Sequence, residues 1–324
     1  MAEITIEQYD SSLEKEWNEF NSNSRNATFL TDRRFMDYHS DRFRDCSLIA
    51  RKNGKIIALL PANICSCGIL HSHQGLTFGG WILPRKHFDC TDMMAVWDAM
   101  TEYCKSRGIK AIDYKPLPYI YASAPSGEDI YALFRHQAAV TECNISACIH
   151  LSDNPGFNTL RRRALRKASA LDIEIKECRT PEAVAEFHCL LTECLSERHK
   201  AAPVHSFAEL QMLAARFPAN IRFFVIKHND KAEAGCCLFL SRKVAHCQYI
   251  ASTPEGRSSD LLTPLFHHLI AMTSAGDFGS EIEFFDFGTS NENNGLVLNE
   301  GLYRQKASMG GSGVPYLRYL QTLD

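Results

Sequence analysis

The residues with the clearest chemical potential lie in the C-terminal half, in the run 245–288. A strand pattern over 245–251 leads into a loop that contains serine, glycine and arginine, and a helical pattern begins at Leu261. The start of a helix presents unpaired N–H groups and a positive dipole end, which together bind anions such as a pyrophosphate. The alternative is an ordinary strand-to-helix turn, capped by Ser259 or Asp260. The residues expected around the anion are Ala251, Ser252, Gly256, Arg257, Ser258 and Ser259.

Three other side chains in this half have the chemistry of acyl transfer to an amine. That reaction needs an unprotonated nitrogen, a polarised carbonyl group and an acid for the leaving group. Asp286 could act as the base or orient the amine, Tyr249 could supply the acid, and Lys306 could hold the carbonyl oxygen or a phosphate. Each also has a structural interpretation, as a strand-end cap, a core aromatic and a helix-end lysine respectively.

Four residues of metal-ligand type, Cys65, Cys67, His71 and His73, lie close together in the N-terminal half. All four share the same parity along the chain. If this segment is extended at ~3.3 Å per residue, the end pair lies too far apart for one ion with bonds of ~2.0–2.3 Å. Only a tight turn at residues 66–69 would gather them, so we expect no metal site.

The composition is that of an ordinary globular protein of 324 residues, long enough for two domains. A net charge of -3 gives no general attraction to nucleic acid or to anionic membranes. There is no signal-peptide pattern and no apolar run near the ~20 residues that span a bilayer, so we expect a cytoplasmic protein without membrane insertion. The 13 cysteines are expected to be reduced, mostly buried thiols.

The elements that must position these residues follow one predicted order in both halves: helices, three strands, a helix and a last strand. In the N-terminal half, hydrophobic spacing, the Asn53-Gly54 turn and a stop at Gly108 predict helices at 6–21, 32–38 and 91–106, with strands at 46–51, 56–64 and 109–114. In the C-terminal half, helices are expected to start at Thr180 and at a capping box of Ser206 and Glu209. They are followed by strands at 221–227, 234–240, 245–251 and 282–287, with a helix at 261–274.

This repetition predicts two duplicated domains of α/β (α+β) class, at 1–150 and 176–324, joined by a linker helix within 151–175. The linker helix is basic. It is either a solvated connection or a positive wall that faces a phosphate-bearing ligand. Its cationic residues are Arg161, Arg162, Arg163, Arg166 and Lys167.

Four short motifs, taken in order, resemble the GNAT superfamily, and specifically its duplicated branch, the FemAB/FemX-like proteins and the acetyltransferases related to them. The motifs are Tyr249-Ile250-Ala251-Ser252, Pro254-Glu255-Gly256-Arg257, Phe285-Asp286-Phe287-Gly288 and Gln305-Lys306. The resemblance covers most of residues 155–320, and the first half by topology and length. It implies two tandem GNAT-like domains, each with a mixed, mostly antiparallel sheet flanked by helices, and a donor site in the second domain.

The resemblance also implies an N-acyltransferase that moves an acyl group from acyl-CoA, such as acetyl-CoA, to an amino group of a small, sugar-linked or nucleotide-linked acceptor. The residues that it places near the acceptor are His73, Trp81, Tyr114, Glu197 and His199. Aminoacyl transfer from tRNA to a peptidoglycan precursor is the alternative, less favoured because the long helical hairpin of some members has no counterpart. The glycine-rich GNAT pyrophosphate signature is also absent, since the loop 254–259 has one glycine. A catalytically silent, ligand-binding tandem domain is a third alternative.

Overall fold

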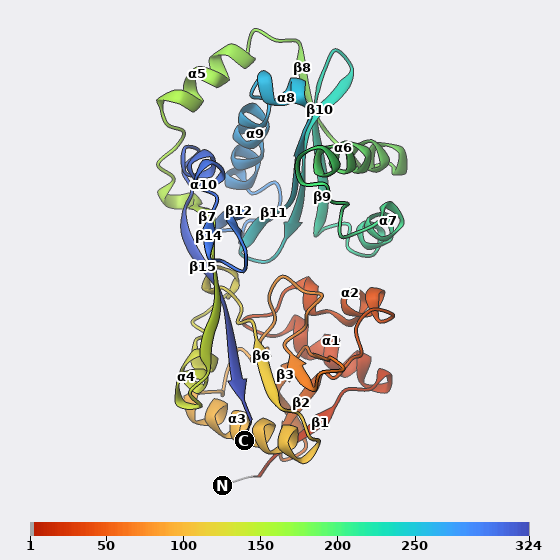
Figure 1. The fold of residues 1–324 in the computed structure, drawn as a ribbon, viewed down its shortest axis with the longest axis vertical. Helices are drawn as coiled ribbons and strands as arrows, with labels where there is room; N and C mark the ends of the chain where they lie inside the picture. Colours follow the sequence, from red (N-terminus) through yellow and green to blue (C-terminus); the bar gives the residue numbers. More distant parts are fainter. Residues whose placement is uncertain (1–2, 324) are drawn as a thin grey trace. The chain divides into compact units, whose positions relative to one another are not determined.

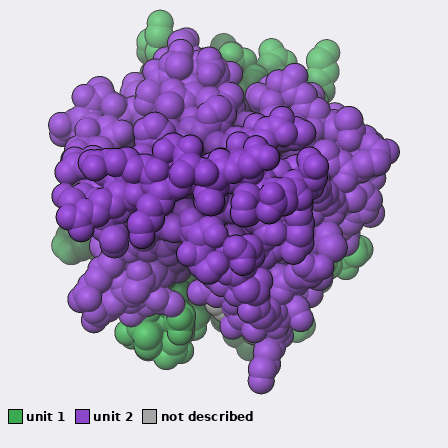
Figure 2. Space-filling model, turned by 90° about the horizontal axis from the view of Figure 1, so that it is seen from above, with its two compact units in different colours: residues 1–144, 291–297, 315–324 green, residues 145–290, 298–314 purple. Residues whose placement is uncertain are grey.

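The computed structural model describes residues 3–323, without the side chain of His199. The chain divides into two compact units (Figure 2). Unit 1 comprises residues 1–144, 291–297 and 315–324, and unit 2 comprises residues 145–290 and 298–314. The predicted ranges 1–150 and 176–324 stay a prediction about separately folding domains.

Unit 1 contains two groups of strands and a long helix, α3 (Cys90–Ser106) (Figure 1). One sheet has the antiparallel order β1-β2-β3, and in the other β4 is antiparallel to β5, β5 is parallel to β6, and β6 is antiparallel to the end of β15. The strands are β1 (Ile4–Gln8), β2 (Leu48–Lys52), β3 (Lys55–Leu60), β4 (Asn63–Ile64), β5 (Ile69–His71), β6 (Ala111–Tyr114) and β15 (Ser312–Thr322). The other helices are α1 (Glu14–Ser22), α2 (Arg33–Met36) and α4 (Glu128–Arg135).

Local signals placed several of these elements correctly. Asp89 caps α3 with a capping box, and the chain leaves the helix through Gly108 at φ +70°. Asn53 and Gly54 both have positive φ and close the β2–β3 hairpin. The predicted helix at 6–21 is wrong in its first part, because Ile4–Gln8 pairs with Leu48–Lys52 as β1. The alternation of Ile4 and Ile6 is the strand signal that the helical spacing masked.

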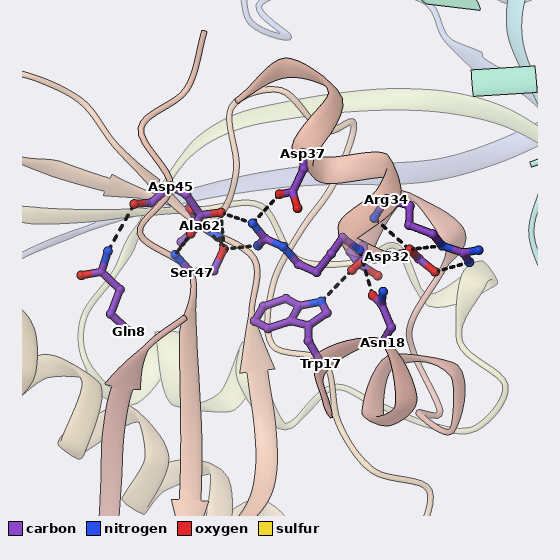
Figure 3. A network of polar contacts seen from close by, with 11 residues as sticks. Gln8, Trp17, Asn18, Asp32, Arg34, Asp37, Asp45, Ser47 and Ala62 are labelled. Atoms are coloured by element: carbon purple, nitrogen blue, oxygen red, sulfur yellow. Dashed lines mark hydrogen bonds and ion pairs between the residues drawn. The ribbon is translucent and has the colours of Figure 1, made fainter. Parts of the chain in front are cut away.

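A buried arginine fixes α2 against the start of β2. Only 3% of the Arg33 side chain is exposed, and its guanidinium donates to Asp37 Oδ1 at 2.5 Å and to Asp45 Oδ2 at 2.7 Å. The Arg33 guanidinium also lies 3.8 Å from the centre of the Tyr9 ring. Burial opposes the charge of Arg33, but the two carboxylates outweigh it and raise the pKa of the guanidinium. Figure 3 shows Asp37 and Asp45, the two carboxylates that accept from this guanidinium, within the surrounding polar network.

Unit 2 is one sheet with the strand order β7-β12-β11-β10-β9-β8. β11 and β12 are parallel, whereas the other neighbouring pairs with a described register are antiparallel. The strands are β7 (Ala139–His150), β8 (Ile173–Glu177), β9 (Ile221–His228), β10 (Lys231–Leu240), β11 (Val244–Ser252) and β12 (Phe284–Thr289). Separately, β13 (Asn291–Glu292) of unit 1 pairs with β14 (Val297–Leu298) in a small ribbon. The helices are α5 (Thr159–Ala168), α6 (Pro181–His199), α7 (Phe207–Arg216), α8 (Pro254–Ser258), α9 (Leu262–Ala275) and α10 (Glu300–Ala307).

Helices α6 and α9 cover opposite faces of the unit 2 sheet (Figure 1). The Phe187 ring of α6 packs on Phe223, with ring centres 5.4 Å apart, and a Cβ on Gly235 would lie 2.9 Å from Phe187. The core under α9 instead contains the next residues along these strands, Phe224 and Cys236. Successive side chains of a strand point to opposite faces, so the two helices enclose the sheet between them.

All thirteen cysteines lie within the described residues. Eleven are free thiols, and eight of these are buried, as expected. The expectation of reduced thiols throughout is wrong for Cys65 and Cys67, which form a disulfide. Composition alone gave no sign that a turn brings this pair to a Cα–Cα distance of 5.3 Å.

Candidate functional site

The parallel pair β11 and β12 separates soon after it forms. Its register in the described chain comprises three pairs, Val244–Phe284, Ala245–Phe285 and His246–Asp286, although both strands continue further. On the other edge of β11, a bulge leaves Gln248 between two successive pairs with β10. A bulge bends a strand and increases its local twist. The C-terminal ends of β11 and β12 therefore diverge and leave a gap in the middle of the sheet.

A cavity of about 410 Å³ lies at this gap. Its volume is in the range of sites that hold small organic ligands. Because it is lined from both α6 and α9, which cover opposite faces, the cavity passes between the separated strands. The lining comes from α6 (Cys194, Arg198), β11 (Ile250, Ala251, Ser252), α9 (Leu262, Phe266), β12 (Phe287), α10 with the residue before it (Asn299, Gly301, Leu302, Gln305, Lys306) and Met309.

Lys306 is the buried cation of this cavity. The Asn299 side chain caps α10, and the helix carries Lys306 inward, where its Nζ donates to Gly288 O at 2.8 Å and to Thr289 O at 2.7 Å. Burial lowers the pKa of the Lys306 ammonium to about 8, although Cys247 and Asp286 favour the charged form. An ammonium has three donors, so one N–H remains for a ligand in the cavity. The Gln305-Lys306 pair lies in the last turn of α10.

Asp286 is completely buried at the end of the β11–β12 register. Its Oδ1 accepts from the Gly288 amide at 3.0 Å and from the Ser146 hydroxyl, and its Oδ2 lies 2.8 Å from Nδ1 of His246. Several donors thus hold the carboxylate in one orientation. The prediction that Asp286 takes the proton itself stays untested, and its burial favours the orienting role that was the other expectation.

His246 is a functional candidate that the sequence reasoning missed. With Asp286 ionised, Nδ1 of His246 donates to the carboxylate, and Nε2 then carries the lone pair that a general base needs. The His246 side chain is 13% exposed, and His246 is not among the residues that line the cavity. The sequence gives no local signal for this contact, because His246 and Asp286 lie 40 residues apart and meet only through the pairing of their two strands.

Tyr249, the predicted acid, is bound to a second histidine. Its hydroxyl lies 2.5 Å from Nδ1 of His205, in the segment just before α7. The two rings meet edge to face with their centres 5.9 Å apart. Tyr249 is not among the residues that line the cavity, and its role as an acid stays a prediction.

The predicted anion loop is divided by the structure. Ala251 and Ser252 line the cavity. The other four residues lie on the short helix α8 or directly after it, where the chain uses its own amides. For example, the Gly256 amide donates to the Thr253 hydroxyl at 2.9 Å, and the Ser259 amide donates to Glu255 O at 3.0 Å. The binding of a pyrophosphate by Gly256, Arg257, Ser258 and Ser259 stays a prediction.

Arg257 and Glu197, predicted for the donor and the acceptor respectively, are paired with each other. The Arg257 guanidinium donates to both oxygens of Glu197, at 2.8 and 3.0 Å, and to Ser252 O at 2.6 Å. This pair ties the end of α6 to α8. His199 ends α6, and its side chain lies outside the described residues.

The predicted acceptor residues of unit 1 are buried. Trp81 and Tyr114 belong to its core, where the Tyr114 hydroxyl accepts from the Trp81 amide and donates to Asp129, both at 2.7 Å. His73 is 3% exposed and has a positive φ of 65°. In these positions Trp81 and Tyr114 stabilise the core of unit 1, and the contact of all three residues with an acceptor stays a prediction.

Gly256 has a packing role that can be tested. A Cβ at this buried position would overlap the backbone oxygen of Glu233 on β10. Overpacking of this kind costs about 1–3 kcal/mol, so Gly256→Ala is expected to lower the denaturant midpoint without a change in slope. The matched control is Gly301→Ala, where the nearest atom would be 3.8 Å away. Equal stability of the two variants would contradict this assignment.

The chain is similar to known proteins in the sequence of one domain and in the fold of nearly its whole length. The family model described as "Acetyltransferase (GNAT) domain" matches residues 158–294. No curated protein sequence matches the chain. Among solved structures, the chain is similar to FemX, with a TM-score of 0.69, 11% identity, and coverage of 98% of this chain and 97% of that one.

Two further structures extend the likeness in fold. L-PGS from Bacillus licheniformis has a TM-score of 0.60 and 12% identity, over 97% of this chain and 92% of that one. A tandem GNAT protein from the clavulanic acid biosynthesis pathway has a TM-score of 0.53 and 10% identity, over 99% of both chains. Residues 158–294 therefore match a GNAT acetyltransferase domain, and the chain as a whole is similar in fold to FemX and to a tandem GNAT protein.

Proposed function

We propose that this protein is an N-acyltransferase that moves an acyl group from an acyl-CoA, such as acetyl-CoA, to the amino group of a small acceptor. The observation that carries the proposal is the cavity between β11 and β12, with the buried ammonium of Lys306 in its wall. An acyl thioester needs an apolar chamber for its chain and a donor for its carbonyl oxygen. The cavity offers Leu262, Phe266 and Phe287 for the first and the third N–H of Lys306 for the second.

The chemical step assigns one task to each polar group. The acceptor nitrogen attacks the carbonyl carbon, and its proton passes to Nε2 of His246, which Asp286 orients. Lys306 stabilises the negative charge that develops on the carbonyl oxygen. The C–S bond then breaks, and the thiolate takes a proton, for which Tyr249 remains the proposed acid.

The exposed side chains of α5 support an acceptor or a donor that carries phosphate. Arg161 is held by Asp260 at 2.7 Å, but four further cations on this helix are exposed. They are Arg162, Arg163, Arg166 and Lys167. Such a cluster suits a nucleotide-linked small molecule, and it equally suits a tRNA backbone, which is the second candidate partner. A tRNA would be recognised by binding that weakens steeply with salt.

Thermal stability with acetyl-CoA tests the donor. A ligand at 100 times its Kd stabilises the folded state by roughly 2.7 kcal/mol, so the melting temperature of the wild type is expected to rise. Leu302 is 38% exposed and lines the cavity, and Leu302→Trp should fill it and abolish the shift. Ile130→Trp, at a similarly exposed position of α4 in unit 1, is the matched control and should keep the shift.

Two results would reject the proposed donor. One is the absence of any shift of the wild type with acetyl-CoA or longer acyl-CoAs. The other is a shift of equal size in Leu302→Trp. A shift without thiol release, tested with a panel of amino acids and amino sugars, would instead favour a ligand-binding protein that performs no transfer.

A further inference from the structure

A tight hairpin in unit 1 brings together two sulfur atoms and an imidazole. β4 and β5 pair through Asn63–His71 and Ile64–Leu70. The chain turns back between them, with the Gly68 amide donating to Cys65 O at 3.1 Å and Gly68 at φ +79°. This turn corrects the extended-chain argument made from the sequence. The potential ligand atoms of Cys65, Cys67 and His71 all lie within 4.8 Å of one another, whereas His73 is not part of the group.

The His71 ring is oriented as a metal-binding histidine would be. Its Nδ1 lies 2.6 Å from Oδ2 of Asp113, and Asp113 is itself held by Arg318, whose Nε donates to Oδ1 at 2.7 Å. Nε2 of His71 is buried and has no hydrogen-bond partner among the described residues. Leaving a buried polar atom unpaired costs free energy. A ring that is fixed through one nitrogen by a carboxylate, with the other nitrogen available, is the usual arrangement of a histidine ligand.

The two sulfurs complete a donor set for a thiophilic ion. Thiolate and imidazole ligands suit Zn²⁺, whose bonds of ~2.0–2.3 Å place neighbouring ligand atoms roughly 3.5–4 Å apart. Small side-chain rotations at Cys65 and Cys67 would therefore suffice once the disulfide is open. Cys67 is exposed and Cys65 is partly exposed, so a reductant, the ion and a water as fourth ligand can all reach the site.

We propose that Cys65, Cys67 and His71 bind one Zn²⁺ ion per chain when the two cysteines are reduced. Two molecules of a low-molecular-weight thiol open the disulfide by exchange. They are oxidised to their own disulfide and supply the two electrons and two protons that make Cys65 and Cys67 thiols. Binding of the ion then releases both thiol protons and forms two Zn–S bonds and one Zn–N bond. The disulfide and the metal exclude each other, since the same two sulfurs make both. The site belongs to unit 1 and does not depend on the proposed acyl transfer.

Metal titration of the full-length protein tests the site. The protein is reduced with a phosphine, desalted without oxygen and titrated with Zn²⁺ against a chromophoric chelator, and in parallel with Co²⁺. We expect one equivalent of Zn²⁺, a thiolate-to-cobalt charge-transfer band, and a higher melting temperature for the Zn²⁺ form. Cys65→Ser with Cys67→Ser should lose all three signals. Asp113→Asn, which alters the orienting partner, should weaken Zn²⁺ binding by roughly 10–100-fold.

The controls separate this site from ordinary thiol binding. Cys143→Ser and Cys189→Ser remove exposed cysteines outside the cluster and should bind Zn²⁺ like the wild type. His71→Gln should keep the fold and lose tight binding. The proposal is overturned if the reduced wild type binds no stoichiometric Zn²⁺, if the double serine variant binds as tightly as the wild type, or if the oxidised protein binds equally well.

Discussion

His246→Ala is expected to lower the rate of acyl transfer by about 10²–10⁴-fold, the usual contribution of a general base. The imidazole is partly exposed and is oriented by the buried carboxylate of Asp286, as a general base requires. The measurement is thiol release from acetyl-CoA with whichever amine of the panel the wild type acylates. Free imidazole should restore part of the activity, since the substitution leaves a space of the same shape beside Asp286.

The controls for this variant distinguish catalysis from folding. His268→Ala removes an exposed histidine of α9 and should keep full activity. Asp286→Asn should lose activity with His246→Ala in a non-additive way, because the two residues act as a unit. Unchanged transfer by His246→Ala, with the acetyl-CoA shift intact, would remove this residue from the mechanism.

Lys306→Met is expected to lower kcat by about 10²–10³-fold, the usual effect of removing one donor to a developing oxyanion. It should also destabilise the fold by about 1–3 kcal/mol, because Gly288 O and Thr289 O lose their buried donor. Arg304→Met removes an exposed cation from the same helix and is the matched control. If Lys306→Met is destabilised but transfers at the wild-type rate, the lysine is structural only.

The pH dependence of Lys306 gives a second signature. Because burial lowers its pKa from 10.5 to about 8, the ammonium loses its charge as the pH rises through 8. The shift caused by acetyl-CoA should therefore shrink in the wild type above pH 8. The free energy of unfolding should instead rise as the pH increases from about 8 to about 10.5. Over this range the unfolded lysine still holds its proton and the folded one has lost it, so the cost of burying the charge disappears. Lys306→Met should show neither trend.

Local signals in the sequence identified much of the fold. Asp89 and Gly108 delimit α3, and the order of motifs through Lys306 led to the tandem GNAT architecture. β7 and β15 were missed because each contributes to both units, a relation that periodicity within one segment does not report. His246 was missed for a related reason. Its partner Asp286 is adjacent only through the register of two parallel strands, and register is set by tertiary packing.

The site prediction had the same limits. Lys306, Ala251 and Ser252 line the cavity. These three could be predicted from the sequence because they stand at the end of a strand and at the end of a helix, which the order of the motifs already indicates. Gly256 and Arg257 do not line it, because a short helix intervenes and the glycine serves a close approach to β10. The sequence alone does not distinguish a turn at Cys65–Cys67 from an extended strand, because the same residues fit both. The turn depends on the positive φ of Gly68.

The short register of β11 and β12 has an evolutionary consequence. The cavity exists because the backbones of β11 and β12 diverge after three register pairs, so it depends on the backbone more than on the side chains that line it. FemX and this protein retain the shared architecture at 11% identity. Substitutions at a few residues that line the cavity, such as Leu262 and Leu302, should therefore change which acyl chain the proposed enzyme prefers, and the fold should remain the same.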